Sequence, residues 1–249
     1  MTRSPLRALL GALLAAAVTG SVLTASLTSP ADAATPKPEV GDCHSLTYVE
    51  SRQVSDTDPR VSCERTHTSR TIAVKTLPGS AFRDNEALGK AGYRACATAL
   101  TTELGSSASA RALSAYGFVF FAPTKAEIKA GARWVRCDIV LRGVKTLLAL
   151  PAAKTPALGA APHAARLAQC IRATSKSVDF TACSTTHNYR AVGTVAVSGS
   201  KYPARSRFRK IAAQRCTAIV GSEDWYTSYP SQYGWVLGKE RQLVCHGRD

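Results

Sequence analysis

Two segments of the chain combine β-branched residues with a partial alternation of apolar and polar positions. They are residues 71–77, which read TIAVKTL, and residues 191–197, which read AVGTVAV. A Gly-Ser pair follows each segment, at residues 79–80 and 199–200. The pattern predicts two strands that each end in a turn.

A helical spacing of apolar and small residues follows each predicted strand. We expect helices at residues 84–104 and 203–220, because such residues recur there at intervals of three and four. Gly105 and Gly221 stand where a helix C-terminus favours a residue that adopts positive φ. Each helix carries one cysteine among the recurring positions, which are Leu88, Gly92, Cys96, Ala99 and Leu100, and Phe208, Ala212, Cys216, Ile219 and Val220. We therefore expect each helix to turn its cysteine toward a sheet.

Further apolar runs lie after the first helix and near the end of the chain. Residues 116–121 and 134–141 predict a pair of strands, and residues 242–245 form a shorter counterpart of the second run. Strands around one helix in each half of the chain predict the α+β class. We expect two tandem, small, disulfide-stapled modules, each with a few antiparallel strands packed on one helix.

The two halves also match residue by residue. A gapless comparison at an offset of 120 residues places Cys63-x-x-Thr-His67 on Cys183-x-x-Thr-His187 and aligns the two helical cysteines. Each half then closes with a proline, an apolar residue five positions later, a glycine three positions after that, and a cysteine. These features indicate two divergent copies of one module.

The N-terminus has the three parts of a secretory signal. Two arginines precede an apolar, alanine-rich stretch, and Ala31-Asp32-Ala33 supplies a small-residue cleavage site. The alternative is an uncleaved membrane anchor, since the stretch approaches the ~20 residues that span a bilayer. We expect a signal peptide at 1–33, a first module at 34–142, an Ala- and Pro-rich linker at 143–168 and a second module at 169–249. After cleavage no stable membrane span is expected.

The composition adds a strong positive charge to this picture. The formal net charge is +15, and removal of residues 1–33, with two arginines and one aspartate, leaves +14. A basic exported protein favours acidic polymers or anionic surfaces by long-range attraction. No block of five or six consecutive basic residues occurs, so nucleic acid is not an expected partner. The expected partner is an anionic cell-wall polymer or an envelope protein.

All eight cysteines fall after the signal, and an even number in an exported protein indicates disulfides before metal or catalysis. We prefer to pair the first two and the last two cysteines of each copy, because these pairs join neighbouring strands and pin the helix to the final strand. Four cysteines still allow three connectivities in each copy. The preferred pairs are Cys43 with Cys63, Cys96 with Cys137, Cys170 with Cys183, and Cys216 with Cys245.

The repeated Cys-x-x-x-His pattern is the most suggestive local chemistry. A structural zinc site needs four ligands, whereas each copy offers one histidine beside cysteines better explained by disulfides. A Cys-His nucleophile needs a free thiol, which an even set of paired cysteines does not leave. His67 and His187 are therefore expected to hydrogen-bond a turn, or else to touch a ligand, and we expect no metal and no cofactor.

Aromatic residues gather just before the last predicted strand, between Trp225 and Trp235. They form either a stacking surface for sugar rings or partner side chains, or part of the core. Motifs of hydrolytic enzymes are sparse, since Gly-x-Ser-x-Gly is absent and acidic residues are few. Trp225 and Trp235 thus join the two histidines as candidate ligand contacts, and no catalytic residue is expected.

The whole pattern resembles the septum formation domain of secreted and membrane-anchored actinobacterial proteins. The resemblance rests on Gly-Asp-Cys43, then Cys63-x-x-x-His67, a strand, a helical cysteine and the closing Pro-to-Cys137 motif. The second copy repeats the pattern but lacks Gly-Asp before Cys170, and Ile128 of the first copy stands where tryptophan is expected. The resemblance implies a cell-envelope role linked to septation and supplies no catalytic residue or cofactor.

These observations lead to one hypothesis and one rival. The hypothesis is a secreted, cell-wall-associated binding or structural protein without enzymatic activity. The rival is a cell-wall-acting hydrolase with His67 or His187 as its base.

Overall fold

The computed structural model describes residues 37–152, 158 and 166–249. The expected signal peptide with its cleavage site after Ala33 lies outside the described residues, as does much of the expected linker. Residues 36–249 cluster into one compact unit, so the two halves of the chain pack together. No helix of the described residues has the length and apolar character needed to cross a membrane.

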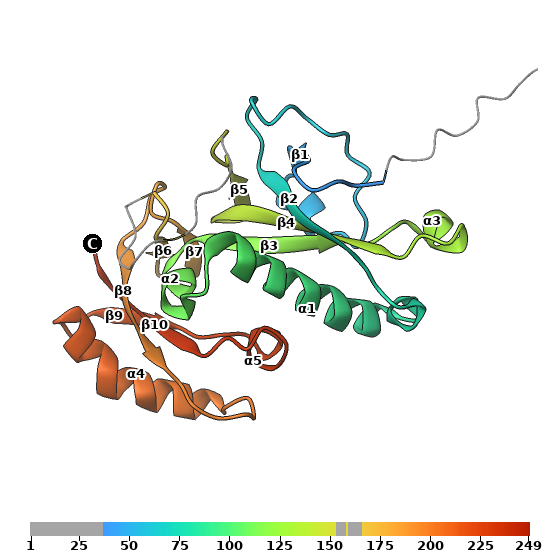
Figure 1. The fold of residues 1–249 in the computed structure, drawn as a ribbon. Coiled ribbons are helices and arrows are strands. Elements are labelled where there is room, and N and C mark those ends of the chain that lie inside the picture. The colour runs from blue at the N-terminus through green and yellow to red at the C-terminus, as the bar shows by residue number, and fades with distance from the viewer. Residues whose placement is uncertain (1–36, 153–157, 159–165) are drawn as a thin grey trace, which may run out of the picture. The chain divides into compact units, whose positions relative to one another are not determined.

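The first half of this unit is built on an antiparallel sheet (Figure 1). The strands follow the order β1-β2-β4-β3, and β5 pairs with β4. Short 3-10 helices and three α-helices connect them. In chain order the elements are β1 (Cys43–His44), η1 (Glu50–Arg52), β2 (Ser69–Thr76), η2 (Gly79–Phe82), α1 (Asn85–Leu104), α2 (Ala108–Leu113), β3 (Tyr116–Phe121), α3 (Lys125–Lys129), β4 (Trp134–Gly143) and β5 (Thr146–Leu148).

The second half has its own antiparallel sheet, with the strand order β7-β6-β8-β10-β9. Its elements are β6 (Gln169–Ala173), β7 (Val178–Ala182), β8 (Tyr189–Ala196), α4 (Arg205–Val220), β9 (Trp225–Ser228), α5 (Gln232–Val236) and β10 (Gln242–Arg248). Two antiparallel sheets, a few helices and four disulfides confirm the predicted α+β class.

The two sheets share one plan. Strands β2 and β8 begin at Ser69 and Tyr189, and helices α1 and α4 begin at Asn85 and Arg205, so both pairs are offset by 120 residues. In each half the helix packs on the sheet and is tied to a central strand by a disulfide. The structure has the preferred pairing: Cys43–Cys63, Cys96–Cys137, Cys170–Cys183 and Cys216–Cys245.

Each helix buries most of the stripe that its spacing predicted, while Leu100, Ile219 and Val220 are partly buried. Leu88, Gly92, Cys96 and Ala99 are buried in α1, and Phe208, Ala212 and Cys216 are buried in α4. Gly92 permits a close approach, because a Cβ there would lie 2.6 Å from the ring of Phe120 on β3. The helices end at Gly105 and Gly221, whose φ angles of 99° and 75° are both positive as expected.

A short helix joins the two halves. Helix α2 packs on β8 and β10, on the face of the second sheet opposite α4. Its Leu113 clusters with Ala191 and Val244, and Ser109 and Thr194 share a hydrogen bond of 2.8 Å. Figure 1 shows α2 between α1 and the second sheet. The first half thus covers the sheet face that α4 leaves open.

Several elements differ from the expectations. Helices α2, α3 and α5 and strand β9 were not predicted, no ranges were predicted for β6 and β7, and β10 extends to Arg248. Strand β5 lies inside the stretch expected to be linker, and Leu148 and Leu150 pack into the first half. Helix α2 packs on β8 and β10, and these long-range contacts are not visible in local patterns. Strands β6 and β7 form a local hairpin of mixed composition, which gives only a weak strand pattern.

Candidate functional site: a groove beside strand β3

The candidate ligand contacts of the sequence do not converge on one site. His67 and His187 lie in equivalent turns before β2 and β8, and the Nδ1 atom of each contacts a carbonyl oxygen two residues earlier, at 2.8 and 2.6 Å. His67 has no exposed surface. The second ring nitrogen of His187 contacts the Asp249 carboxylate at 2.8 Å. Both histidines therefore contact the backbone of the turns in which they lie.

The two tryptophans pack within the second half. Trp235 has no exposed surface and donates a hydrogen bond to the Ser200 carbonyl at 3.2 Å. The guanidinium of Arg241 stacks 4.1 Å from the centre of the Trp235 ring. Trp225 is partly exposed and donates from Nε1 to Thr217 Oγ1 at 3.0 Å. Trp235 is a core residue, and Trp225 alone of the pair retains open surface.

One cluster of metal-ligating atom types occurs among the described residues. Cys170, Cys183 and His187 bring their ligand atoms within 4.8 Å of one another. The two sulfur atoms are joined in a disulfide, so they offer no thiolates to zinc. This cluster is explained by the staple and the turn that it holds.

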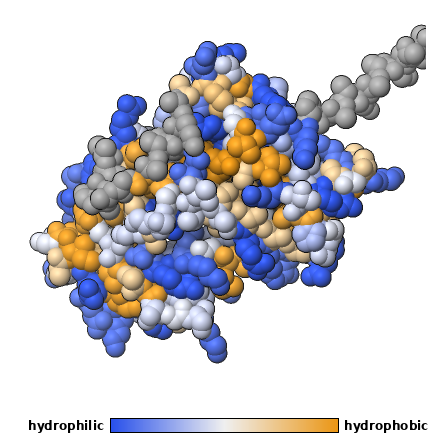
Figure 2. All heavy atoms as spheres, viewed as in Figure 1, coloured by the Kyte–Doolittle hydropathy of each residue, from blue (hydrophilic) through white to orange (hydrophobic). Residues whose placement is uncertain are grey.

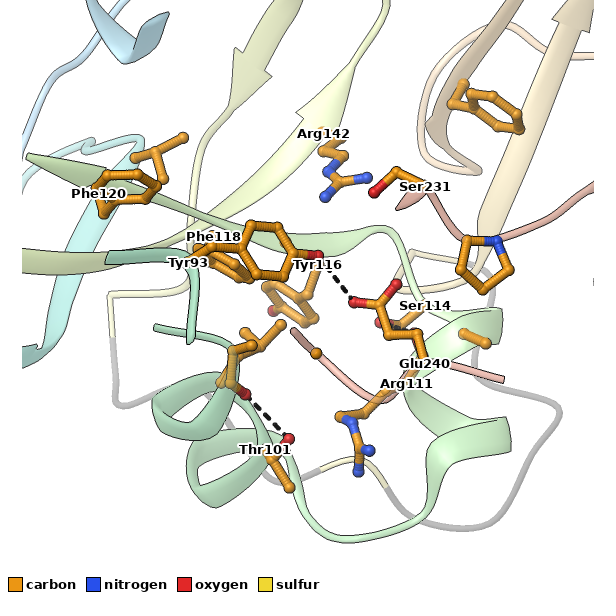
Figure 3. A pocket seen from close by; sticks show the side chains of 18 of the residues that line it. Tyr93, Thr101, Arg111, Ser114, Tyr116, Phe118, Phe120, Arg142, Ser231 and Glu240 are labelled. Atoms are coloured by element: carbon orange, nitrogen blue, oxygen red, sulfur yellow. Dashed lines mark hydrogen bonds between the residues drawn. The ribbon is translucent and has the colours of Figure 1, made fainter. Parts of the chain in front are cut away.

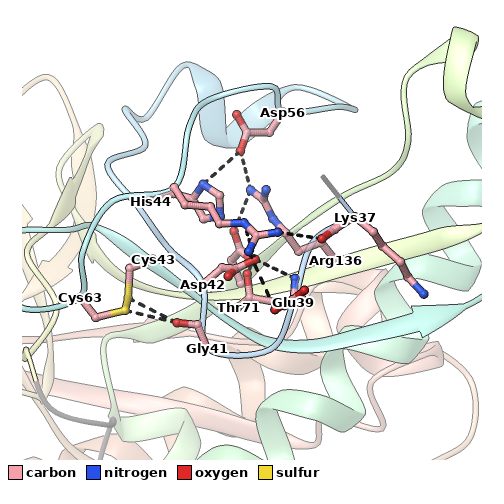
Figure 4. Close-up of polar contacts among 12 residues, drawn as sticks. Lys37, Glu39, Gly41, Asp42, Cys43, His44, Asp56, Cys63, Thr71 and Arg136 are labelled. Atoms are coloured by element: carbon pink, nitrogen blue, oxygen red, sulfur yellow. Dashed lines mark hydrogen bonds and ion pairs between the residues drawn. A yellow bond between two sulfur atoms is a disulfide. The ribbon is translucent and has the colours of Figure 1, made fainter. Parts of the chain in front are cut away.

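A polar network lies buried beneath the first sheet, on the side away from α1 (Figure 4). The guanidinium of Arg136 contacts the carboxylates of Asp56 and Asp138 at 2.5 and 3.0 Å, and Thr71 donates to Asp138 at 2.8 Å. Burial raises the pKa of Asp138 and lowers that of the neighbouring His44. The network ties β2 and β4 to the segment that follows η1, and its burial keeps it from outside ligands.

A cavity of about 660 Å³ lies where the two halves meet, within the range usual for ligand sites. We call it the β3 groove. The first half lines it mainly with Tyr93, Arg111, Tyr116, Phe118, Phe120 and Arg142, and the second half with Gln169, Phe180, Ser231, Lys239, Glu240 and Arg241. In Figure 3 the labelled side chains of the first half come from α1, α2, β3 and β4, and Ser231 and Glu240 come from the turns on either side of α5. Gln169 and Phe180 add to the lining from β6 and β7.

Aromatic rings form one wall of the β3 groove. The rings of Tyr93 and Phe118 meet edge to face with centroids 5.1 Å apart, and Tyr93 meets Tyr233 in the same way at 5.9 Å. The hydroxyl of Tyr93 donates to Glu240 at 3.2 Å. Burial, reinforced by the Glu240 carboxylate, raises the pKa of Tyr93. Tyr93 therefore acts as a neutral hydrogen-bond donor that links the two halves.

A second tyrosine of the wall has an unused polar group. The buried Tyr116 hydroxyl has no hydrogen-bond partner among the described residues, and burial raises its pKa. An unpaired buried hydroxyl costs free energy, so a ligand that reached it would recover a hydrogen bond.

Positive charge surrounds the β3 groove. Among the described lining residues the basic side chains are Arg52, Arg111, Arg142, Lys239 and Arg241, against the single acidic side chain of Glu240. Arg142 is exposed and lies over Gly117, where a Cβ would come within 2.4 Å of its Nε atom. Burial lowers the pKa of Arg111. The groove thus combines aromatic contact area with an excess of cations, a chemistry suited to an acidic partner with apolar parts.

A match to one protein family accompanies this geometry. The septum formation family model matches residues 40–233, which is more than half of the chain. The chain belongs to the septum formation family. The match is continuous, beginning just before β1 and reaching α5, so it includes both halves and most of the β3 groove. No curated protein and no solved structure matches the chain.

The Gly-Asp-Cys segment around the first cysteine has a structural role. Gly41 adopts a positive φ of 99°, and the Asp42 carboxylate accepts a hydrogen bond from the Glu39 amide at 2.7 Å. Asp42 also pairs with Arg60 at 3.1 Å (Figure 4). These contacts close the turn that delivers Cys43 to its disulfide.

Sequence reasoning did not identify the β3 groove. Tyr93 and Glu240 are 147 positions apart. Arg142 directly follows the run of residues 134–141, which was predicted as a strand from its apolar residues. The one usable signal was the aromatic run of residues 116–121, which was interpreted only as one strand of a pair.

Proposed function

We propose that this septum-family protein is an extracytoplasmic, non-enzymatic binding protein of the cell envelope, and that the β3 groove takes an anionic envelope partner. The observation that carries the proposal is the groove itself, with five basic side chains, one acidic side chain and an aromatic wall. Family membership supports a role linked to septation.

An extracytoplasmic location is supported by the cysteines. Eight cysteines form four disulfides, and none of the described cysteines is free. Disulfides of this kind persist in oxidising compartments. Together with the signal-like N-terminus, this favours export of the chain and a place at the cell wall.

A binding role is favoured over hydrolysis by the surroundings of the two histidines. His67 is fully buried. Both ring nitrogens of His187 are engaged, by the Thr185 carbonyl and the Asp249 carboxylate. A general base needs an open nitrogen within reach of the proton that it removes.

We also propose that the two halves are divergent copies of one module. The shared offset of β2 and α1 against β8 and α4, with a helix-to-strand disulfide in each half, supports this origin. The copies have not stayed independent, because α2 of the first packs on the sheet of the second. The β3 groove exists only where both are present, which gives the duplication a functional consequence.

The surface outside the groove is mixed in character. On the face shown in Figure 2, hydrophobic residues form separate patches with hydrophilic residues between them. This arrangement favours recognition through a defined groove and its charges.

Cosedimentation of the non-reduced protein with purified cell envelope, at rising salt, tests the proposal. The Arg142→Gln, Lys239→Gln double variant should bind several-fold more weakly at low salt, because it removes two groove charges, and salt should abolish the difference. The matched control is Lys75→Gln with Lys129→Gln, two exposed lysines outside the groove lining. Equal loss in both double variants, or no binding by the wild type at low salt, would refute the proposal.

A further inference from the structure

Strand β3 is the open edge of the first sheet. It pairs with β4 on one side, and on the other side no strand of the described residues pairs with it. The amide of Arg142 donates to the carbonyl of Ala115 at 3.2 Å, which fixes the alternation of the ladder. Residues 117, 119 and 121 then direct their backbone groups toward β4, and residues 116, 118 and 120 direct theirs outward.

The outward groups have no backbone partner in the part of the chain that the structure describes. The open stretch is bounded at both ends by segments that bond this edge. Ala122 donates to the Val54 carbonyl at 2.8 Å, and Ala115 donates to the Leu167 carbonyl at 2.7 Å. Between these two contacts, Tyr116, Phe118 and Phe120 offer three N–H donors and three carbonyl acceptors.

This open edge lies along the β3 groove, since residues 116–120 all line the cavity. Natural proteins usually protect an edge with a proline, an inward-pointing charge, a bulge or a cover. Strand β3 reads Tyr-Gly-Phe-Val-Phe-Phe and pairs with β4 in a regular register without a bulge. An edge that none of these devices protects among the described residues, and that lies along a preformed cavity, has the geometry of a site for strand addition.

We propose that the β3 groove binds an extended, acidic segment of an envelope protein, which adds to β3 as a further strand. This inference rests on the proposed function and names the partner class. Charge selects the occupant, because the groove lining carries five basic residues and one acidic residue. The main-chain pairing requires an extended polypeptide, which a glycan or polyphosphate cannot supply.

The two faces of β3 specify an alternating sequence. Phe118 and Phe120 lie on the face that packs on the core beneath α1, and Gly117 lies on the opposite face under the Arg142 guanidinium. Successive side chains of an added strand point to opposite faces. The partner should therefore place apolar residues beside the phenylalanines and acidic residues beside Arg142, over about six residues, a span of about 20 Å.

Amide exchange with defined peptides tests this pairing in the full, non-reduced protein. The probe is a synthetic eight-residue peptide that alternates valine and glutamate, and the control peptide alternates valine and lysine. The acidic peptide should protect the amides of Tyr116, Phe118 and Phe120 from exchange. Protection at Gly117 and Val119 should stay unchanged, because these amides already bond to β4. Uniform protection of the whole strand, or protection elsewhere only, would overturn the proposal.

A pair of variants separates the backbone contact from the side chain. Both Phe118→Ala and Phe118→Pro remove the ring, but the proline also removes the outward N–H while leaving the ladder to β4 intact. The acidic peptide should bind Phe118→Pro about tenfold more weakly than Phe118→Ala, since it loses a hydrogen bond and meets the proline ring. Equal affinities for the two variants would contradict strand addition, and if the proline variant does not fold, amide exchange in the wild type decides.

The outcomes also separate this inference from the proposed function. Charge-dependent binding to the cell envelope without any binding of the acidic peptide would overturn strand addition and leave the proposed function standing. Peptide binding at β3 without retention on the envelope would overturn the proposed function instead. Equal binding of the acidic and basic peptides would overturn the charge argument.

Discussion

Lowering the pH should destabilise the protein through one buried histidine, His246 on β10. Its ring has no exposed surface, and its Nε2 lies 3.1 Å from the Gln169 Oε1 atom at the border of the β3 groove. This contact fits a neutral ring that carries its proton on Nε2. Burial lowers the pKa of His246 from 6.5 to about 4, because the protonated ring would lose its hydration.

The sign and size of the effect follow from the two pKa values. The unfolded chain protonates His246 near pH 6.5, whereas the folded chain resists protonation until about pH 4. The contribution of neutral His246 to the free energy of unfolding is therefore fully present above pH 6.5. It decreases as the pH drops toward 4. The difference of about 2.5 between the pKa values corresponds to about 3 kcal/mol in full, and about 2 kcal/mol should be lost between pH 7.5 and pH 5.

Urea unfolding of the non-reduced protein, followed by tryptophan fluorescence at several pH values, measures this loss. The burial of His44 acts in the same direction, so the comparison of variants isolates His246. Between pH 7.5 and pH 5, the free energy of unfolding of His246→Gln should fall by about 2 kcal/mol less than that of the wild type. Val244→Ala, a non-titrating change on the same strand, should lower stability and keep the wild-type pH dependence. The reasoning fails if His246→Gln retains the full pH dependence.

Three further changes test the framework of the fold. Arg136→Met should lower the free energy of unfolding by about 3 to 5 kcal/mol, because two buried carboxylates lose their cation; a urea-measured loss below about 1 kcal/mol would contradict the buried network. Replacing both Cys96 and Cys137 by alanine opens a loop of 41 residues and should lower the free energy of unfolding by about 4 kcal/mol. An unchanged calorimetric midpoint would show that the bridge is dispensable. Trp235→Ala should lower the free energy of unfolding by about 3 to 5 kcal/mol, because a fully buried ring is lost. An unshifted midpoint in guanidinium unfolding would refute its place in the core.

The periodic elements were predictable because their signals are local. The helical stripe around Cys96 and its counterpart around Cys216 predicted α1 and α4 to within two residues at their first positions. The paired aromatic and apolar runs likewise predicted β3 with the bounds that the structure has.

The missed elements depend on distant contacts or have weak local patterns. Helix α2 has only six residues, too few to be stable alone, and it is held by packing of Leu113 against Ala191 and Val244. Strands β6 and β7 are mixed in composition and gain their order by pairing with each other and with β8. Local propensity gives little indication of such segments.

The candidate site was beyond the sequence for the same reason. Its walls come from both halves, and the link between Tyr93 and Glu240 spans 147 positions. The residues that the sequence favoured, His67 and Trp235, were distinctive because they hold turns and core, and both are fully buried. The repeated motif therefore indicated residues that hold turns and disulfides. The groove, in contrast, arises where one half of the chain packs on the other.

Competition on the isolated cell envelope tests the central claim most directly. Protein bound to the envelope at low salt is treated with rising concentrations of the alternating valine–glutamate peptide or its valine–lysine control. The account predicts that the acidic peptide releases the wild-type protein and that the basic peptide does not. Protein that stays on the envelope at saturating acidic peptide would contradict a role for the β3 groove in envelope binding.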